Sequence, residues 1–173
     1  MKISSVLIKE NEINEICERL GKQITADYQG KEIVLICILR GATVFMADLM
    51  RKIKVPCEID FMSVSSYTGS KSSGDVKIIK DLEDSIEGKH VIVVEDIIDS
   101  GLTLSHLLKL LQSRNPASLR LCACFDKPER RKTDVHVDYI GKQIPDEFIV
   151  GYGLDYNGQY RNLPDVCILS ESD

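Results

Sequence analysis

Residues 91–104, VIVVEDIIDSGLTL, carry three carboxylates directly after a run of branched aliphatic side chains. Glu95 and Asp96 are adjacent, and Asp99 follows in the same short segment. Two neighbouring acids alone would favour a solvated strand end with helix-capping carboxylates. The third carboxylate favours a functional site instead, because clustered carboxylates repel one another and need a ligand. Such groups accept hydrogen bonds from hydroxyls and bind hard divalent cations.

Small and hydroxyl-bearing residues follow the acids, namely Ser100, Gly101 and Thr103. They lie where a helix should begin, so the exposed amides and the helix dipole favour an anion such as phosphate. Phosphate next to carboxylates is tolerated if sugar hydroxyls and Mg²⁺ lie between them. The segment therefore predicts a ligand with a phosphate, a polyol ring and a metal-bound polyphosphate.

Two other glycine-containing segments are weaker candidates for phosphate binding. Residues 69–74, GSKSSG, are followed by Asp-Val and lack the lysine of a P-loop. Residues 151–156, GYGLDY, lack the third glycine of a dinucleotide fingerprint. An ATPase that would use VIVVED as a Walker B strand is excluded, because the chain has no Walker A motif.

Apolar runs and helical periodicities alternate along the chain. Residues 33–39 and 91–94 are continuous apolar runs, which are typical of strands buried on both faces of a parallel sheet. This alternation predicts an α/β fold with right-handed crossovers and a mostly parallel sheet, in which ligands bind at the carboxyl ends of the strands. The ends after Leu39, Val94 and Phe125 should converge on one cleft. The expected helices are 11–28, a segment from Gly41 onward and one from Thr103 onward; the other expected strands are 57–64, 76–80, 118–125, 136–140, 147–150 and 166–169.

The composition fits one globular domain of 173 residues with 43% hydrophobic residues. A net charge of −5 argues against a general nucleic-acid surface, and no apolar run approaches the roughly 20 residues of a membrane span. The six cysteines are scattered, several within apolar runs, which is typical of reduced thiols in a cytoplasmic protein. Cys122 and Cys124 are interpreted as core residues, because no further Cys or His pair completes a metal site.

The segment 91–104 resembles the signature of the type I phosphoribosyltransferases, which bind phosphoribosyl pyrophosphate. Other motifs, in the same order and over about residues 5–169, resemble the hypoxanthine(-guanine) phosphoribosyltransferases. The resemblance implies one phosphoribosyltransferase domain over 1–173 with its core at about 30–145. It also implies a small hood from the N-terminal segment and about 146–173, and a mobile lid at 65–76. The additional motifs are LRG (39–41), SSYTGSKSSGDVKI (65–78), DKPERR (126–131) and DEFIVGYGLDYNGQYRNLPDVCIL (146–169).

The reaction that this resemblance implies transfers the phosphoribosyl group to a 6-oxopurine, through an oxocarbenium-like transition state. Glu95 and Asp96 would hold the ribose hydroxyls, directly or through Mg²⁺, and Asp99 would be the general acid/base near purine N7. The 5′-phosphate would be bound by Ser100, Gly101, Leu102 and Thr103. Some relatives have Lys at position 102, so Leu102 could lower the affinity for phosphate.

Pyrophosphate would be bound by Leu39, Arg40 and Gly41, a segment that contains a non-proline cis peptide in the family, and by Arg161. Whether this peptide is cis here cannot be read from the sequence, and Arg40 alone would be interpreted as a surface cation.

The base would be bound by Lys127, Phe148, Ile149 and Asp155. Lys127 would donate to the 6-oxo group, which favours oxopurines over adenine. Phe148 would stack on the purine and Ile149 would offer backbone groups, whereas Asp155 would bind a second Mg²⁺. The metal ligands would thus be Glu95, Asp96 and Asp155. For Phe148, core packing is an equal alternative if the resemblance is set aside.

Ser66 and Tyr67 would close over the site and exclude water. The neighbouring Arg130, Arg131 and Lys132 are interpreted as a solvated face, and the three histidines receive no role.

Purine salvage with hypoxanthine, and with guanine as a second base, is the favoured function, with IMP or GMP and pyrophosphate as products. The alternative is a regulator of the same fold that senses phosphoribosyl pyrophosphate and binds nucleic acid, which would need a basic surface. We therefore expect small-molecule substrates, Mg²⁺ as cofactor, no nucleic-acid or membrane partner, a cytoplasmic location and, by family habit, a homodimer or homotetramer. The preference among hypoxanthine, guanine and xanthine stays open.

Overall fold

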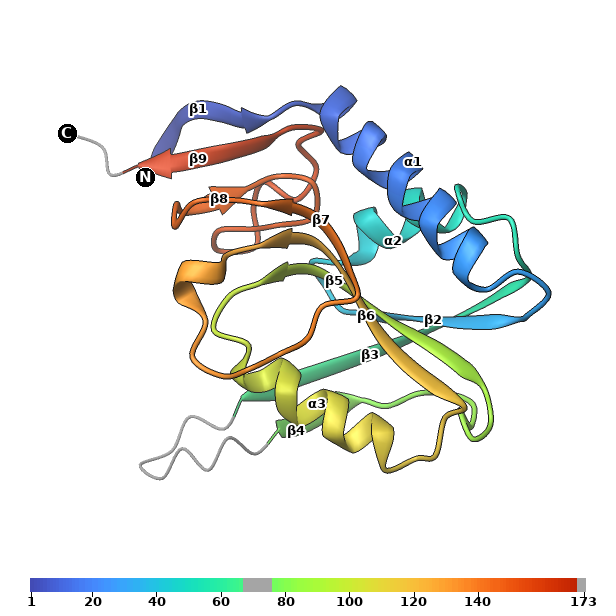
Figure 1. Ribbon diagram of the computed structural model, residues 1–173. Coiled ribbons are helices and arrows are strands. Elements are labelled where there is room, and N and C mark those ends of the chain that lie inside the picture. The colour runs from blue at the N-terminus through green and yellow to red at the C-terminus, as the bar shows by residue number, and fades with distance from the viewer. Residues whose placement is uncertain (67–75, 171–173) are drawn as a thin grey trace.

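The computed structural model describes residues 1–66 and 76–170, and its main feature is a central sheet in the order β4-β3-β2-β5-β6-β7 (Figure 1). All neighbouring strands of this sheet pair in parallel except β3 and β4, which are antiparallel. The expected mostly parallel α/β fold is confirmed. The strands are β2 (Ile33–Ile38), β3 (Cys57–Ser66), β4 (Val76–Lys80), β5 (His90–Ile98), β6 (Ser118–Asp126) and β7 (Tyr139–Gln143).

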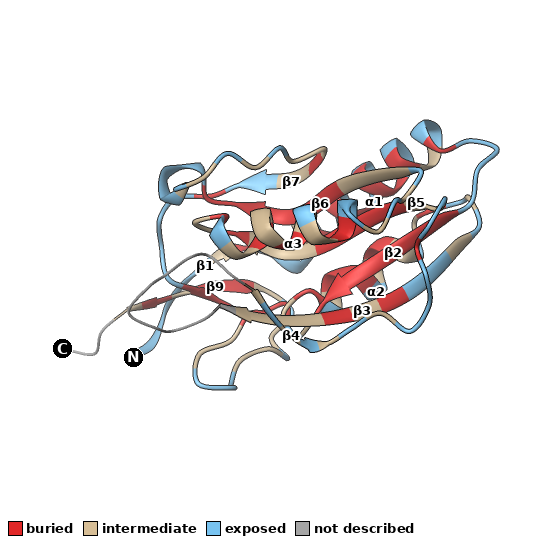
Figure 2. Ribbon diagram, turned by 90° about the horizontal axis from the view of Figure 1, so that it is seen from below, coloured by how far each residue is buried: buried red, intermediate tan, exposed pale blue. Residues whose placement is uncertain are grey.

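Helices cover both faces of this sheet. Helices α1 (Glu10–Asp27) and α2 (Thr43–Met50) pack on one face, and α3 (Leu102–Gln112) packs on the other (Figure 1). A short 3-10 helix, η1 (Pro128–Arg130), follows β6. The central strands β2 and β5 are buried between these layers, whereas the outer faces of the helices are exposed (Figure 2).

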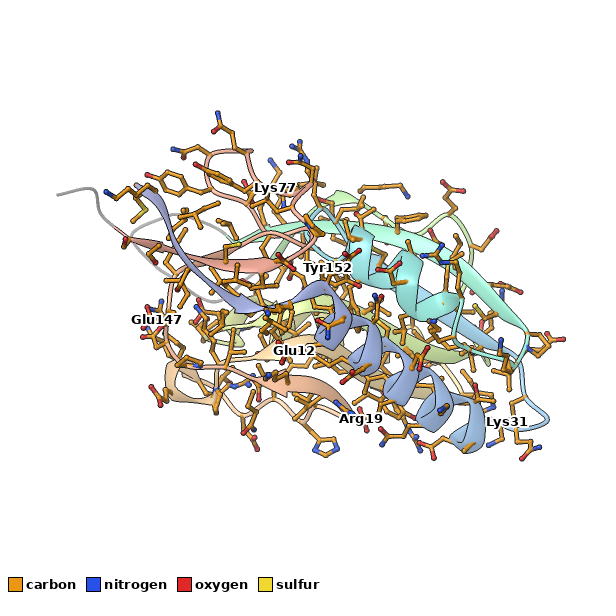
Figure 3. All side chains as sticks on the ribbon, turned by 90° about the horizontal axis from the view of Figure 1, so that it is seen from above. Glu12, Arg19, Lys31, Lys77, Glu147 and Tyr152 are labelled. Carbon is orange, nitrogen blue, oxygen red and sulfur yellow. The ribbon has the colours of Figure 1, made fainter. Side chains whose placement is uncertain are left out.

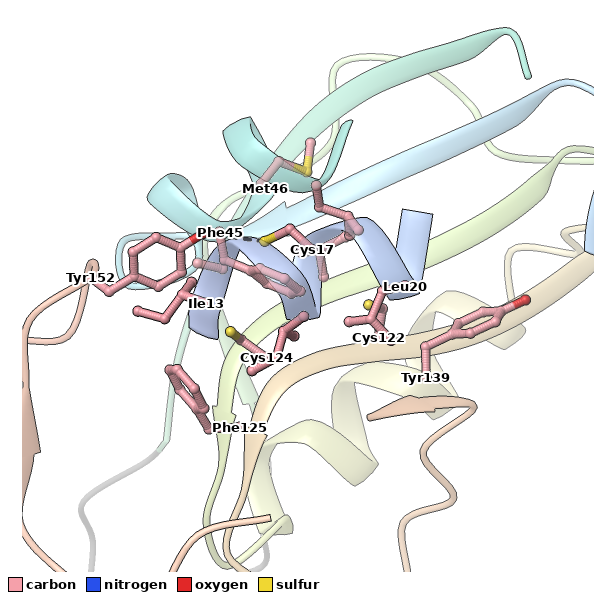
Figure 4. Packing of buried hydrophobic residues seen from close by; sticks show 14 of the residues in the cluster. Ile13, Cys17, Leu20, Phe45, Met46, Cys122, Cys124, Phe125, Tyr139 and Tyr152 are labelled. Carbon is pink, nitrogen blue, oxygen red and sulfur yellow. Dashed lines mark hydrogen bonds between the residues drawn. The ribbon is translucent and has the colours of Figure 1, made fainter. Parts of the chain in front are cut away.

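Successive residues of the buried strands point to opposite faces, which divides the core in two. Leu35 and Cys37 of β2 pack with α1 and α2, while Val34 and Ile36 pack on the side of α3. Cys122 and Cys124 lie on the same face of β6, in the cluster with α1 and α2, as the sequence predicts (Figure 4). All six cysteines are free thiols, which agrees with the sequence-based interpretation of reduced thiols.

The two ends of the chain form a second sheet of three antiparallel strands in the order β1-β9-β8. These strands are β1 (Lys2–Ile8), β8 (Ile149–Val150) and β9 (Val166–Ser170), and β1 and β9 lie side by side next to the carboxyl ends of the central strands (Figure 1). The sequence analysis predicts β8 and β9 but misses β1.

Several boundaries differ from expectation, most of them by one or two residues. The strand expected at 136–140 begins three residues later, at Tyr139. Just before it, the Asp138 amide donates to the Leu121 carbonyl over 3.0 Å, and the Asp138 side chain accepts from the Leu121 amide over 2.9 Å, so a carboxylate takes the place of a backbone carbonyl there. The helix expected from Gly41 begins at Thr43. Within the described residues, every helix is too short or too polar to cross a membrane.

Candidate active site

The carboxyl ends of β2, β5 and β6 open into one cavity of about 540 Å³. Residues at the ends of these strands form one side of the cavity, and residues 146–161, which include β8 of the smaller sheet, form the other side. The convergence that the sequence predicts is therefore confirmed. Eight of the predicted site residues line this cavity: Gly41, Asp96, Asp99, Lys127, Phe148, Ile149, Asp155 and Arg161.

A second, smaller cavity of about 140 Å³ lies between β5 and the start of α3. It is lined by Glu95, Ser100, Gly101 and Thr103, and it shares Asp99 with the larger cavity. Gly101 is the N-cap of α3 with φ +78°, a left-handed conformation that glycine adopts at little cost. Gly101, Thr103 and Leu104 at the start of α3 line this cavity, and the first amides of a helix have no partner within the helix, so this is a position where a phosphate can bind.

Leu102 is the first residue of α3, and its side chain is 43% exposed. Leu39, Arg40 and Leu102 are not among the described residues that line either cavity. Their predicted roles would have to come from their backbone groups, except for the exposed guanidinium of Arg40.

Glu95 and Asp96 form a partly buried pair of acids at the end of β5. Burial, followed by repulsion from Asp96, raises the pKa of Glu95 well above its usual range. Burial also raises the pKa of Asp96, although the Ile97 amide, which donates to its carboxylate over 2.7 Å, opposes this effect. Two carboxylates in this situation are stabilised by a cation or by hydroxyl donors.

Asp99 is held by Arg130. The guanidinium Nε donates to Asp99 Oδ1 over 2.8 Å, and Nη1 lies 3.5 Å from Asp146 Oδ1. The side chains of Asp99 and Arg130 are about half exposed, so the ion pair adds little to folding stability. It does fix one oxygen of Asp99 and leaves the other able to contact a ligand in the cavity.

Gly41 lies against the acids on β5. A Cβ atom at this position would be 1.6 Å from Asp96 Oδ2, so only glycine fits. The preceding Leu39-Arg40 peptide is cis. Thr43 Oγ1 donates to the Arg40 carbonyl over 2.7 Å, which joins this turn to the first turn of α2.

Arg161 and Asp155 approach the cavity from the loop after β8. Their side chains form an ion pair of 2.7 Å, and Arg161 Nη1 also donates to the Gly153 carbonyl over 2.6 Å. The amide of Gly158 donates to the other oxygen of Asp155 over 2.8 Å. Both oxygens of Asp155 therefore already have partners.

Lys127 lies at the end of β6 and is only 8% exposed. Its ammonium donates to the Glu147 carbonyl over 2.6 Å, next to Phe148. Glu147 lies on the rim, where its side chain points outward (Figure 3). The ring of Phe148 is 45% exposed and meets the edge of Tyr156 at 89° with ring centres 5.6 Å apart. An exposed aromatic face and a buried cation can receive a flat heterocycle that carries an acceptor oxygen.

The interpretation of residues 130–132 as a solvated face is wrong for Arg131, whereas Arg130 and Lys132 are exposed as expected. Arg130 holds Asp99, and Arg131 is largely buried in an ion pair with Asp126 behind Gly101. The pattern of three consecutive cations hides this difference. Of the predicted lid pair, Ser66 ends β3, whereas Tyr67 lies outside the described residues, as does most of the 65–76 segment.

The predicted metal ligands, Glu95, Asp96 and Asp155, fit a Mg²⁺ site only in part. In the described part of the chain, no three Asp, Glu, His or Cys side chains come close enough to surround a cation. The Glu95–Asp96 pair has the repulsion that a cation would relieve, whereas Asp155 is already paired with Arg161. Mg²⁺ commonly binds one or two carboxylates and completes its shell with substrate oxygens and water, which this arrangement allows.

The parallel sheet, the cavity between β5 and the start of α3, and the acid pair together indicate a phosphoribosyltransferase of type I. The phosphoribosyl transferase domain model matches residues 7–157. The hypoxanthine-guanine phosphoribosyltransferase of Staphylococcus aureus strain Mu50 is 53% identical over 168 residues, which cover 96% of this chain and 94% of that protein.

Two solved structures have the same fold over nearly their whole length. A hypoxanthine phosphoribosyltransferase from S. aureus has a TM-score of 0.94 and 51% identity, and the match covers 97% of this chain and 92% of that one. A hypoxanthine-guanine phosphoribosyltransferase from Bacillus anthracis, with HEPES in its active site, has a TM-score of 0.94 and 49% identity, and the match covers 98% of this chain and 100% of that one. The chain belongs to the phosphoribosyltransferase family and, within it, to the hypoxanthine-guanine phosphoribosyltransferases of purine salvage.

Proposed function

We propose that this enzyme transfers the 5-phosphoribosyl group from phosphoribosyl pyrophosphate to hypoxanthine and guanine and releases pyrophosphate. The observation that carries the proposal is the meeting of two cavities at Asp99. One offers amides for a phosphate, and the other offers a buried lysine and an exposed aromatic ring for a base. A nucleotide in this position would have its ribose next to Glu95 and Asp96.

Each residue has a role in this proposal that its position supports. Ser100, Gly101, Leu102 and Thr103 bind the 5′-phosphate through amides and hydroxyls. Glu95 and Asp96 accept hydrogen bonds from the ribose hydroxyls. Leu39, Arg40, Gly41 and Arg161 bind the departing pyrophosphate. Asp99 takes the proton that the purine ring loses as a ring nitrogen bonds to the anomeric carbon and the bond from that carbon to pyrophosphate breaks.

Mg²⁺ is the proposed cofactor, held by Glu95 and Asp96 and, at a second position, by Asp155. Bound there, it would neutralise charge on pyrophosphate. Binding at Asp155 would require its ion pair with Arg161 to open, which would also free Arg161 for the pyrophosphate.

The smaller sheet β1-β9-β8 and the loops beside it form the proposed hood over the core at about 30–145, and Ser66 and Tyr67 belong to the proposed lid. A cytoplasmic location and assembly as a homodimer or homotetramer complete the proposal. The free cysteines support the location, and the assembly is proposed from the family to which the chain belongs.

Pyrophosphate release by the purified protein tests the proposal. We expect release from phosphoribosyl pyrophosphate and Mg²⁺ with hypoxanthine and with guanine, and its loss in excess EDTA. Comparing kcat/KM for hypoxanthine, guanine and xanthine sets the base preference. No turnover with any oxopurine would reject the proposal and favour a regulator, and full activity in EDTA would reject the metal.

Replacing Lys127 by Ala should weaken binding of the purine base and leave binding of phosphoribosyl pyrophosphate nearly unchanged. A hydrogen bond from a charged group contributes about 1.5–3 kcal/mol, so we expect KM for hypoxanthine to rise about 10- to 150-fold. KM for phosphoribosyl pyrophosphate should change less than about twofold. The exposed Lys132 gives a matched control, because Lys132→Ala removes a cation of the same loop that lines neither cavity. An unchanged KM for hypoxanthine in Lys127→Ala would contradict this role.

A further inference from the structure

The hydroxyl of Tyr152 joins three segments that are far apart in the sequence. The side chain is 5% exposed and donates to Asp48 Oδ2 on α2 over 2.8 Å. Cys17 of α1 lies beside it, with Sγ 3.5 Å from the same hydroxyl (Figure 4). Tyr152 itself lies between the smaller sheet and α2 (Figure 3).

The backbone of Tyr152 has an uncommon conformation. Its φ is +50°, a region that side chains other than glycine and asparagine rarely adopt. Such conformations persist only where the surroundings enforce them, and they are concentrated at functional sites. The buried hydroxyl contact and the Tyr152 amide, which donates to the Leu163 carbonyl over 2.8 Å, supply that constraint.

The residue after Tyr152 connects this anchor to Arg161. The Gly153 amide donates to the Arg161 carbonyl over 3.0 Å, and Arg161 Nη1 donates back to the Gly153 carbonyl over 2.6 Å. The backbone and the side chain of Arg161 are therefore both held by Gly153, the residue that follows Tyr152.

Gly153 also touches the turn before α2. A Cβ atom on Gly153 would lie 2.1 Å from the Gly41 carbonyl oxygen, so the two backbones are in direct contact. The loop and α2 thus meet at two points, Gly153 against Gly41 and Tyr152 against Asp48. These two contacts fix the orientation of the loop relative to α2, whereas one contact would let the loop rotate.

We propose that Tyr152, through Asp48, is a positioning residue that holds Arg161 in register with the Leu39-Arg40-Gly41 turn. The inference rests on the proposed function, since it deepens the pyrophosphate side of that site. Tyr152 touches no substrate in this proposal. It aligns two pyrophosphate-binding segments that come from different elements, one before α2 and one after β8.

Tyr152→Phe tests the inference, because it keeps the buried ring and removes only the hydroxyl. We expect KM for phosphoribosyl pyrophosphate, and the Kd for inorganic pyrophosphate by calorimetry, to rise about tenfold. KM for hypoxanthine should change less than about twofold. Asp48→Ala should reproduce this split, although it also removes the exposed Arg51–Asp48 ion pair, and the double variant should be no worse than either single variant, because both remove the Tyr152–Asp48 contact.

Two further variants separate positioning from stability. Asp48→Asn keeps an oxygen acceptor for the tyrosine and should restore KM to near the wild-type value. Cys17→Ala removes the neighbouring thiol but not the Tyr152–Asp48 contact, and should leave both KM values unchanged. A lower Tm with an unchanged ratio of the two KM values, or equal increases in both, would overturn the inference. Absence of turnover in the wild-type protein would instead reject the proposed function.

Discussion

Asp99→Asn should lower kcat by about 100- to 10,000-fold, which is the range that a positioned general acid or base contributes. The attacking purine nitrogen must lose a proton, and an amide cannot accept it. Asn retains the shape and the oxygen that receives the Arg130 Nε hydrogen bond, so the loop should keep its conformation. The loss should therefore be in the chemical step and not in binding.

Binding measurements separate these two possibilities. Phosphoribosyl pyrophosphate should bind Asp99→Asn with a Kd within about threefold of wild type, because its contacts come from other residues. Glu129→Gln is a matched control that removes an exposed carboxylate from η1 next to Arg130 and should leave kcat unchanged. Wild-type turnover in Asp99→Asn would end the general acid/base assignment.

The part of the site on β5 is predictable from the sequence because local signals agree. Four consecutive aliphatics indicate a strand buried on both faces, and the change to Glu95 and Asp96 marks the start of its polar part. The expectation that the strand ends at these acids is wrong, because β5 continues to the buried Ile98. The glycine at 101 then marks the start of α3. Parallel strands bring such ends to one edge of the sheet, so the convergence with Lys127 follows from topology.

Strand β1 lacks such signals. Its first residues are exposed, and irregularities in its register with β9, between Ile3 and Ser5 and between Val6 and Ile8, break the alternation that identifies a strand. Its pairing partner is at the opposite end of the chain, so only the tertiary fold specifies it.

Contacts across the site are also invisible in the sequence. Arg130 and Arg131 are adjacent, yet one binds Asp99 and the other is paired with buried Asp126. Tyr152 lies in a segment that resembles the family, but its partner Asp48 is 104 residues away. These roles depend on side-chain directions that composition and periodicity do not encode.

Gly41→Ala should damage the site although it changes no titratable group. The added methyl would lie 1.6 Å from Asp96 Oδ2, so the carboxylate or the whole turn must move. Overpacking of this kind costs about 1–3 kcal/mol in stability. Because both the pyrophosphate turn and a ribose-binding acid are displaced, we expect kcat/KM for phosphoribosyl pyrophosphate to fall about 100-fold or more, which corresponds to about 2.7 kcal/mol.

The control is a glycine in open space. Gly30 has φ +76°, and a Cβ atom added there would have no neighbour within 4 Å. Asn tolerates that backbone conformation, so Gly30→Asn should retain activity. Thermal unfolding gives a temperature at which Gly41→Ala is folded. Steady-state kinetics at that temperature distinguish a displaced site from a loss of folded protein. If folded Gly41→Ala keeps the wild-type kcat/KM, the close contact between Asp96 and this turn is not needed for activity. That result would also contradict the proposed position of pyrophosphate beside the ribose.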